Sequence, residues 1–200
     1  MPIDYERLLD WKIPDARQSY GLRDTMFYAL SVGLGADPLD AGQGRYVYEK
    51  ALVALPSMVT ALAAPGGWLR DPGTGVTSVG LLAAEQSFEI HRALPVSGTV
   101  TGTSRVIEVA DLELMRKLGH PQPTLHGLYM MGVACHGLLR ELCGYDAAEL
   151  RGMGVRFSAL GYVGETLRTE MWREGGEVLF QCRAVERDKI VLSNGRASLV

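Results

Sequence analysis

Residues 123–143 read PTLHGLYMMGVACHGLLRELC and form the most apolar long stretch of the chain. Small residues at Gly132, Ala134 and Gly137 reduce the bulk between the large apolar side chains. The large apolar positions are Leu128, Val133, Cys135, Leu138, Leu139 and Leu142. On a helix they would cover more than one face, and such a helix has to be surrounded by protein. The stretch therefore predicts a central core helix.

The same stretch is about as long as a membrane span. Four polar or charged side chains interrupt it at positions that are costly in lipid: His126, His136, Arg140 and Glu141. The sequence therefore predicts a helix buried in protein, and no membrane partner.

Strands that can surround this helix are predicted on both sides of it. After the helix, alternating patterns occur at residues 155–160, 165–174, 177–188 and 189–200, and earlier β-like runs cover 81–94 and 98–109. An antiparallel sheet with one long buried helix predicts an α+β protein in which the sheet wraps around the helix, the arrangement called a hot-dog fold. A second copy, internal or from a partner chain, would cover the rest of the helix, and we expect a homodimer.

Composition limits the class of protein. The chain has 200 residues, of which 47% are hydrophobic and 22% charged, enough for one large domain or two small ones with real cores. The formal net charge is -3, and the lysines and arginines are scattered rather than clustered. A nucleic-acid partner is therefore not expected, because no basic patch is available for a phosphate backbone.

The three cysteines, Cys135, Cys143 and Cys182, form no C-x-x-C pair, and two of them fall in apolar helix or strand patterns. This usage is typical of a reducing, intracellular setting. The N-terminal segment is charged where a secretory signal needs an apolar run, and the final residues SLV are not a peroxisomal tripeptide. We therefore expect a cytoplasmic location.

The first half of the chain has its own pattern. Residues 24–40 indicate a short helix that runs into a turn at Asp37-Pro38, residues 45–50 a strand, residues 54–64 a helix, and residues 68–76 a turn-rich loop. The segment ALPSMVTALA of the first half is similar to PTLHGLYMMGVA of the second, and each enters a helix through a proline. The first copy lacks the His-Gly pair.

Seven stretches together resemble a known family. They are RDTMFYALSVGLGADPLD (23–40), RYVYEKALVALPSM (45–58), WLRDPGTGV (68–76), EQSFEIHRALPVSGTV (85–100), PTLHGLYMMGVACHGLLRELCG (123–144), VRFSALGYVGETLRTEMWREG (155–175) and AVERDKIVLSNG (184–195). In this order they resemble the MaoC-like hydratases, specifically the double-hot-dog R-specific enoyl-CoA hydratases that occur alone in bacteria and as the hydratase part of peroxisomal multifunctional enzymes.

The resemblance implies a shortened or composite double hot dog. Residues 1–109 would be the N-terminal, non-catalytic half, and residues 110–200 the C-terminal half without its first strand. The family's catalytic motif, Y-x-L-S-G-D-x-N-P-L-H, supplies an Asp and a His, but this chain passes directly from TGTSRVIEV to ADLELMRKLG. The nearest copy, YALSVGLGADPLD, aligns Asp37 with the Asn, Asp40 with the His and Gly35 with the catalytic Asp, so the Asp/His pair is not identified.

By resemblance, the helix start binds the acyl-CoA thioester. Gly127 would give its backbone N–H to the thioester oxygen on which negative charge develops, because amides at a helix N-terminus are ready donors. His126 would shape the thioester pocket. Further substrate-binding residues are expected at Pro123, Thr124, Leu125, Leu128 and Tyr129. No cofactor and no metal are implied, and the sequence contains no H-E-x-x-H, G-x-S-x-G or nucleotide-binding glycine motif.

Alternatives remain open at this point. His126-Gly127 alone is equally typical of a helix start with a hydrogen-bonded histidine and a packing glycine. The resemblance implies a hydro-lyase for the reversible hydration of trans-2-enoyl-CoA to (R)-3-hydroxyacyl-CoA, in fatty acid β-oxidation or hydroxyacyl-CoA supply. The missing motif leaves two other hypotheses, a non-catalytic acyl-CoA-binding or scaffold protein and an inactive, truncated relic of the hydratase.

Overall fold

The computed structural model describes residues 5–76, 83–107, 124–174 and 177–200. Contacts within the backbone divide the chain into two compact units. The smaller unit combines Met1–Ser19, Leu62–Leu82 and Thr99–Pro121, and the larger combines Tyr20–Ala61, Ala83–Gly98 and Gln122–Val200. Each unit thus draws on segments that are far apart in the sequence.

The smaller unit is built around two paired strands. It begins with α1 (Tyr5–Leu9), and β1 (Ala16–Tyr20) pairs with β3 (Gly98–Gly102). Two short 3₁₀ helices, η3 (Trp68–Arg70) and η4 (Pro72–Thr74), occupy the loop at residues 68–76. Asp71 caps η4 through a 2.7 Å hydrogen bond that its carboxylate accepts from the Gly73 amide. The prediction of a turn-rich loop is confirmed.

The larger unit holds the sheet and the long helix. Its elements are α2 (Leu22–Ser31), α3 (Ala41–Val47), η1 (Glu49–Ala51), η2 (Pro56–Ala61), β2 (Glu85–Glu89), α4 (Gly127–Leu142), η6 (Ala147–Glu149), β4 (Leu150–Phe157), β5 (Leu167–Glu174), β6 (Glu177–Ala184), η7 (Val185–Arg187) and β7 (Lys189–Leu199). The long helix and strands β5, β6 and β7 lie where the sequence predicts them, whereas β4 begins five residues before the predicted range of 155–160 and ends three residues before its end.

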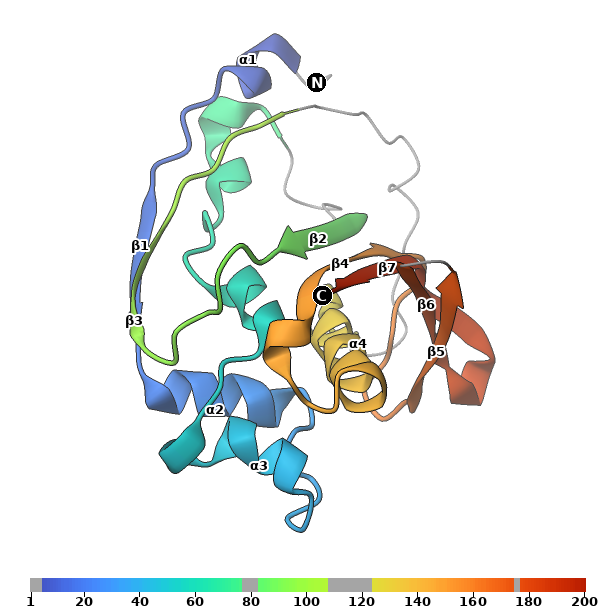
Figure 1. Cartoon of the computed structure of the whole chain (residues 1–200). Helices are drawn as coiled ribbons and strands as arrows, with labels where there is room; N and C mark the ends of the chain where they lie inside the picture. Colours follow the sequence, from blue (N-terminus) through green and yellow to red (C-terminus); the bar gives the residue numbers. More distant parts are fainter. Residues whose placement is uncertain (1–4, 77–82, 108–123, 175–176) are drawn as a thin grey trace. The chain divides into compact units, whose positions relative to one another are not determined.

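Five antiparallel strands of the larger unit form one sheet in the order β2-β4-β7-β6-β5. Figure 1 shows strands β4 to β7, in orange to red, curving around α4 in yellow. Alternate side chains of β6 are buried, as expected for a strand with one face toward the core. They are Val178, Phe180, Cys182 and Ala184. The hot-dog arrangement is confirmed.

Helix α4 is the core of this unit, as its apolar sequence predicts. Its buried residues are Met130, Met131, Gly132, Ala134, Cys135, Leu138 and Leu139. Gly132 allows the closest approach, because a Cβ atom there would lie 2.5 Å from Cγ1 of Val32. At the C-terminal end, Gly144 adopts a positive φ of 53° and the Tyr145 amide donates to the Leu139 carbonyl at 2.9 Å.

Strand β2 gives the sheet its composite character. It pairs with β4 from Glu85 opposite Arg156 to Glu89 opposite Gly152. The sequence of β2 precedes α4, whereas β4, β5, β6 and β7 all follow it. The sheet around the second-half helix therefore contains a strand from the first half of the chain.

The strand predicted for residues 45–50 is wrong. Residues 41–47 form helix α3, and residues 49–51 form η1 after Tyr48. The reason is the cap at Asp40, whose carboxylate accepts hydrogen bonds from the amides of Gly42 and Gln43 at 2.9 and 3.4 Å. Tyr46 is fully buried and donates to the Tyr145 carbonyl at 2.9 Å. A tertiary contact thus overrides the alternating pattern of this segment.

Three other elements are shorter than predicted. The helix expected at residues 54–64 is a six-residue 3₁₀ helix, η2. Its β-branched Val59 and Thr60 weaken α-helix propensity. In the described residues of the runs at 81–94 and 98–109, the strands are the five-residue β2 and β3. The segment ADLELMRKLG (110–119), whose pattern is typical of a helix, lies outside the described residues.

Candidate functional site

The candidate site is the N-terminal end of α4 together with the strand-like residues before it. Thr124 forms an antiparallel bridge with Tyr162, and the Leu125 amide donates to the Gly161 carbonyl at 2.8 Å. Leu125 also packs against the hydrophobic core. The chain therefore enters the helix along a fixed path, held by the loop that follows β4.

His126 caps the helix. Its Nδ1 atom accepts a hydrogen bond from the Leu128 amide at 3.2 Å, and its carbonyl accepts from Tyr129 and Met130 at 3.0 and 3.3 Å. These bonds account for three of the first four amides of the helix, which by geometry lack partners within it. His126 therefore makes its hydrogen bonds locally, at the helix start.

The amide of Gly127 is the remaining one. Within the described part of the chain, no hydrogen bond uses this N–H group. The ring of Phe157 lies close by, and a Cβ atom at Gly127 would be 3.0 Å from its Cε1 atom. Glycine at this position thus lets the main chain pack against an aromatic ring, and its helix-end N–H has no partner among the described residues.

The other predicted substrate-binding residues lie along the same turn. Thr124 is exposed, Leu125 and Leu128 are half-buried, and Tyr129 is 40% exposed. Pro123 lies outside the described residues. The structure thus gathers Thr124–Tyr129 at one helix end.

Among the described residues of the larger unit, two of the hollows are lined by residues other than those of this helix end. One of about 850 Å³ runs between α4 and β5, with His136, Arg140 and Met171 in its lining. The other, of about 560 Å³, is lined by β2, β4 and β7, including Glu85 and Arg156. Neither contains Thr124–Tyr129.

Asp37 and Asp40 are both used as backbone caps. The Asp37 carboxylate accepts from the Leu39 amide at 2.9 Å. Besides its two amide bonds, Asp40 accepts from Nε2 of Gln43 at 3.0 Å, and this hydrogen bond lowers the pKa of the carboxyl group below its usual range. Both carboxylates therefore act as the turn and cap groups that their sequence positions predict.

His136 lies farther along α4 and is half-buried, as expected of a boundary histidine. Its Nδ1 atom is 3.3 Å from the Val32 carbonyl, while Nε2 is buried without a partner among the described residues. Burial lowers the pKa of the imidazole, which favours the neutral form. The described residues include no group of three or more His, Cys, Asp or Glu side chains that could hold a metal ion. No helix among them is long and apolar enough to cross a membrane.

Two charged residues near the site, which form one ion pair, are not predicted by the sequence. Arg187 and Glu165 form an ion pair behind the loop that holds Leu125, and the hydrogen bond from Arg187 lowers the pKa of the Glu165 carboxyl group. They are 22 residues apart in the sequence and belong to different elements. The stretches GETLR and AVERD belong to the family resemblance but carry no local signal that links them.

Comparison with protein families gives two matches. A MaoC like domain matches residues 110–195, and the MFE-2 hydratase 2 N-terminal domain matches residues 18–116. The two matches meet at residues 110–116, and together they extend over most of the chain.

Two full-length relatives and one solved structure are similar to the chain. The enoyl-CoA hydratase ChsH3 of Mycobacterium tuberculosis is 21% identical over 98% of this chain and 98% of its own length. The peroxisomal enoyl-CoA hydratase 2 of Arabidopsis thaliana is 23% identical over 93% of this chain and 92% of its own. The MaoC-like dehydratase of Phytophthora capsici has the same fold, with a TM-score of 0.73, 23% identity and 98% of both chains covered.

The length of the alignment with the mycobacterial protein shows that this chain lacks residues that the relative contains. The alignment with the mycobacterial protein extends over 280 residues, whereas this chain has 200. At least 80 residues of the relative therefore have no counterpart here.

Proposed function

This chain belongs to the MaoC-like hydratase family, and on that premise we propose that it binds trans-2-enoyl-CoA and catalyses its reversible hydration to (R)-3-hydroxyacyl-CoA. The family is one of hydro-lyases that act on acyl-CoA thioesters. Acid-base addition of water to a conjugated thioester needs no redox cofactor, and none is proposed.

The free amide of Gly127 is the observation that carries this proposal. Addition of water at the β-carbon places negative charge on the thioester oxygen. A helix-end N–H group stabilises that charge, and the partial positive charge of the 16-residue helix α4 adds to the effect. Because Gly127 has no side chain, a thioester can approach its main chain closely. His126, Leu125, Leu128 and Tyr129 are proposed to surround the thioester.

The water-activating pair is the part of the reaction for which the described residues offer no candidate. Asp40 already accepts three hydrogen bonds as a cap, so its oxygens are occupied. We propose that the pair comes from a second chain, or from residues outside the described ranges.

The direct test is hydration of crotonyl-CoA and longer enoyl-CoAs by the purified protein. Loss of the enoyl absorbance, with formation of the R-3-hydroxyacyl product, supports the proposal. No loss at any chain length contradicts the hydratase function for this chain.

A second candidate function is acyl-CoA binding without turnover. It is favoured by the 80 or more residues of the full-length relative that this chain lacks, since the resemblance expects the catalytic motif among them. Calorimetric titration with butyryl-CoA separates the two candidates. Binding without hydration of crotonyl-CoA would favour the binding protein, and absence of both would favour an inactive relic.

We also propose a homodimer formed through β5. This strand ends the order of described strands in its sheet, and an unpaired edge is a template for another chain. An antiparallel pairing of two β5 strands centred on Met171 would place Arg168 opposite Glu174 of the second copy, twice. Arg168→Glu should weaken a dimer seen by sedimentation, and adding Glu174→Arg should restore it. A monomer at all concentrations would contradict the proposal.

The domain division and the location are proposed on narrower grounds. A division into residues 1–109 and 110–200 is supported by the two family matches, which meet at residues 110–116. A cytoplasmic location is supported by three buried, unpaired cysteines, although the Arabidopsis relative is named as peroxisomal. Cell fractionation tests the location, and recovery in peroxisomes would contradict it.

A further inference from the structure

A group of polar contacts holds the loop behind the helix start. Arg187 forms a two-pronged ion pair with Glu165, and its Nη2 atom is 2.9 Å from Oε2 of that carboxylate. The same Nη2 atom donates to the Leu160 carbonyl at 2.8 Å. The guanidinium group also lies over the ring of Tyr162, 4.6 Å from its centroid. One side chain thus contacts the loop at three residues.

Glu165 completes the arrangement from within the loop. Its Oε2 atom accepts a hydrogen bond from the Tyr162 amide at 2.8 Å. Glu186, the neighbour of Arg187, accepts from the Thr166 amide with both oxygens, at 3.0 and 2.9 Å. The loop is therefore fixed at both its ends by charged groups.

Gly161 lies between the two fixed residues and holds the candidate site. Its preceding residue, Leu160, is bound by Arg187, and its following residue, Tyr162, is bound by Glu165. The Gly161 carbonyl accepts the hydrogen bond from the Leu125 amide at 2.8 Å. A Cβ atom at Gly161 would lie 2.6 Å from Sδ of Met130, so the loop also packs closely against the first turns of α4.

From these contacts we propose that Arg187 and Glu165 are positioning residues, which hold the Leu160–Tyr162 loop and through it fix Leu125 and the Gly127 amide for the thioester. The assignment of a thioester ligand rests on the function proposed above. The positional part rests only on the contacts among Arg187, Glu165, Gly161 and Leu125.

The burial of this pair distinguishes it from an ordinary surface ion pair. The Glu165 side chain is 10% exposed and that of Arg187 35%, whereas exposed pairs contribute little because water screens them. The bidentate fork of an arginine also fixes direction, which a lysine cannot do.

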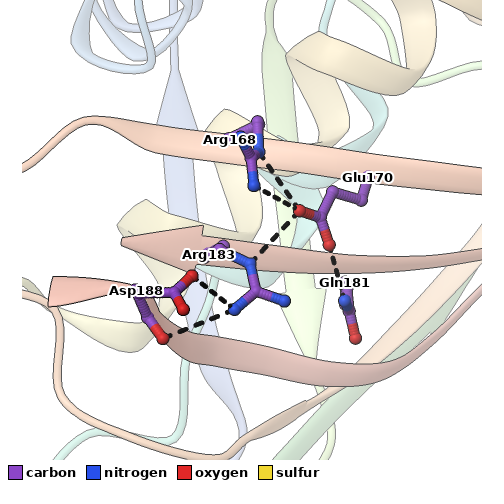
Figure 2. A network of polar contacts seen from close by, with 5 residues as sticks. All are labelled: Arg168, Glu170, Gln181, Arg183 and Asp188. Atoms are coloured by element: carbon purple, nitrogen blue, oxygen red, sulfur yellow. Dashed lines mark hydrogen bonds and ion pairs between the residues drawn. The ribbon is translucent and has the colours of Figure 1, made fainter. Parts of the chain in front are cut away.

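The chain offers a matched control four residues away. Figure 2 shows Arg183 on β6, where it lies between two acidic residues. One is Glu170 on the neighbouring strand β5, and the other is Asp188 in the turn that follows η7. Arg183 is likewise an arginine in an ion-pair network, but its partners among the described residues, Glu170 and Asp188, lie outside the Leu160–Thr166 loop. Removing its charge should leave the helix start unchanged.

The test compares the wild-type protein with Arg187→Gln, Glu165→Gln and the control Arg183→Gln. Hydrogen exchange at the Leu125 amide reports the position of the helix start, and exchange at the Phe180 amide in β6 reports the integrity of the sheet. We expect Leu125 exchange to accelerate about tenfold in Arg187→Gln and Glu165→Gln, since a hydrogen-bonded partner is removed. Leu125 exchange in the control and Phe180 exchange in all variants should remain unchanged.

Titration with butyryl-CoA gives the second measurement. The dissociation constant should rise about tenfold in the two site variants and stay unchanged in the control. Arg187→Lys should restore part of the loss, because an ammonium group can still face Glu165 but lacks the fork that reaches Leu160. If a variant accelerates hydrogen exchange at the Leu125 amide but binds butyryl-CoA as tightly as the wild type does, the proposed role of this ion pair in thioester binding is overturned.

The two hypotheses fail in different ways. If Leu125 exchange in Arg187→Gln equals that of the control, the positioning role is overturned, whatever the protein binds. If the wild type does not bind butyryl-CoA while Leu125 exchange still responds to Arg187→Gln, the proposed function fails and the positioning of the helix start stands.

Discussion

The ring of Phe157 lies directly against the main chain of Gly127, so that a Cβ atom at Gly127 would be 3.0 Å from Cε1 and 3.1 Å from Cζ of the ring. A residue of strand β4 therefore leaves little room for a side chain at the first position of the central helix. The same close approach leaves the Gly127 amide uncovered by a side chain of its own.

The first prediction concerns Gly127→Ala. The ring of Phe157 has to shift by a few tenths of an ångström, which should lower the free energy of unfolding by about 1 kcal/mol. Affinity for butyryl-CoA should fall about tenfold, because the methyl group hinders the thioester. Gly44→Ala is the control, since its Cβ atom meets nothing within 4 Å. Unchanged affinity in Gly127→Ala would count against the site.

A second prediction compares two glycines inside α4. In Gly132→Ala the new methyl group would be 2.5 Å from Cγ1 of Val32, so the unfolding free energy should fall by about 1–3 kcal/mol. In Gly137→Ala the nearest atom, Cε of Met171, is 3.4 Å away, and the helix should gain up to about 1 kcal/mol. Chemical denaturation measures the unfolding free energies of both variants, and Gly137→Ala should be the more stable. Equal values would show that Val32 has room for a methyl group at position 132.

A third prediction concerns acid stability. The Glu170 carboxylate accepts hydrogen bonds from Gln181, Arg183 and Arg168, which lower its pKa from 4.5 to about 2. A depressed pKa stabilises the folded state fully above about pH 4.5, and this contribution is lost as the pH falls toward 2. The unfolding free energy of Glu170→Gln should therefore decrease less than that of the wild type between pH 6 and pH 3.

Glu49→Gln is the control for this acid titration, because Glu174 on the same strand as Glu170 is proposed to face Arg168 in the dimer. Glu49 is an exposed glutamate of η1 whose carboxylate makes no hydrogen bond or ion pair within the described residues. The unfolding free energy of Glu49→Gln should follow that of the wild type at each pH. If the unfolding free energies of Glu170→Gln and the wild type fall equally between pH 6 and pH 3, the loss of stability in acid does not come from Glu170.

The fourth prediction concerns thiol reactivity. Burial raises the pKa of Cys135, Cys143 and Cys182 to about 11 in each case. At pH 8 about one thiol in a thousand is then ionised, and only the thiolate reacts readily. A disulfide reagent should label the native protein slowly and all three cysteines after denaturation. Rapid labelling of one native thiol would show that its surroundings open.

The sequence predicts those parts of the fold that depend on neighbouring residues. The apolar run of α4 and the alternation in β6 are local patterns, and both elements lie where they were expected. Residues 45–50 were predicted wrongly because the alternation of Tyr46 and Tyr48 imitates a strand. The deciding feature, the cap at Asp40, belongs to the segment before them.

In the candidate site, too, the sequence predicts what depends on neighbouring residues and not what depends on distant ones. His126 and Gly127 are neighbours at a helix start, so the family resemblance could assign the Gly127 amide to the thioester from the sequence. The ion pair of Arg187 with Glu165 joins residues 22 apart, and the contact of Glu85 with Arg156 joins residues 71 apart. Contacts of this kind depend on how the strands pair, which periodicity within one segment does not specify.

The recruitment of β2 into the sheet has a consequence for how such a chain can be altered by recombination. If Glu85–Glu89 were exchanged or removed, β4 would present a row of unpaired backbone groups along its length from Gly152 to Arg156. A fusion protein that replaces the first half of this chain should thus be stable only when the new sequence supplies a strand that can pair with β4. The two halves cannot be exchanged independently, because both contribute strands to one sheet.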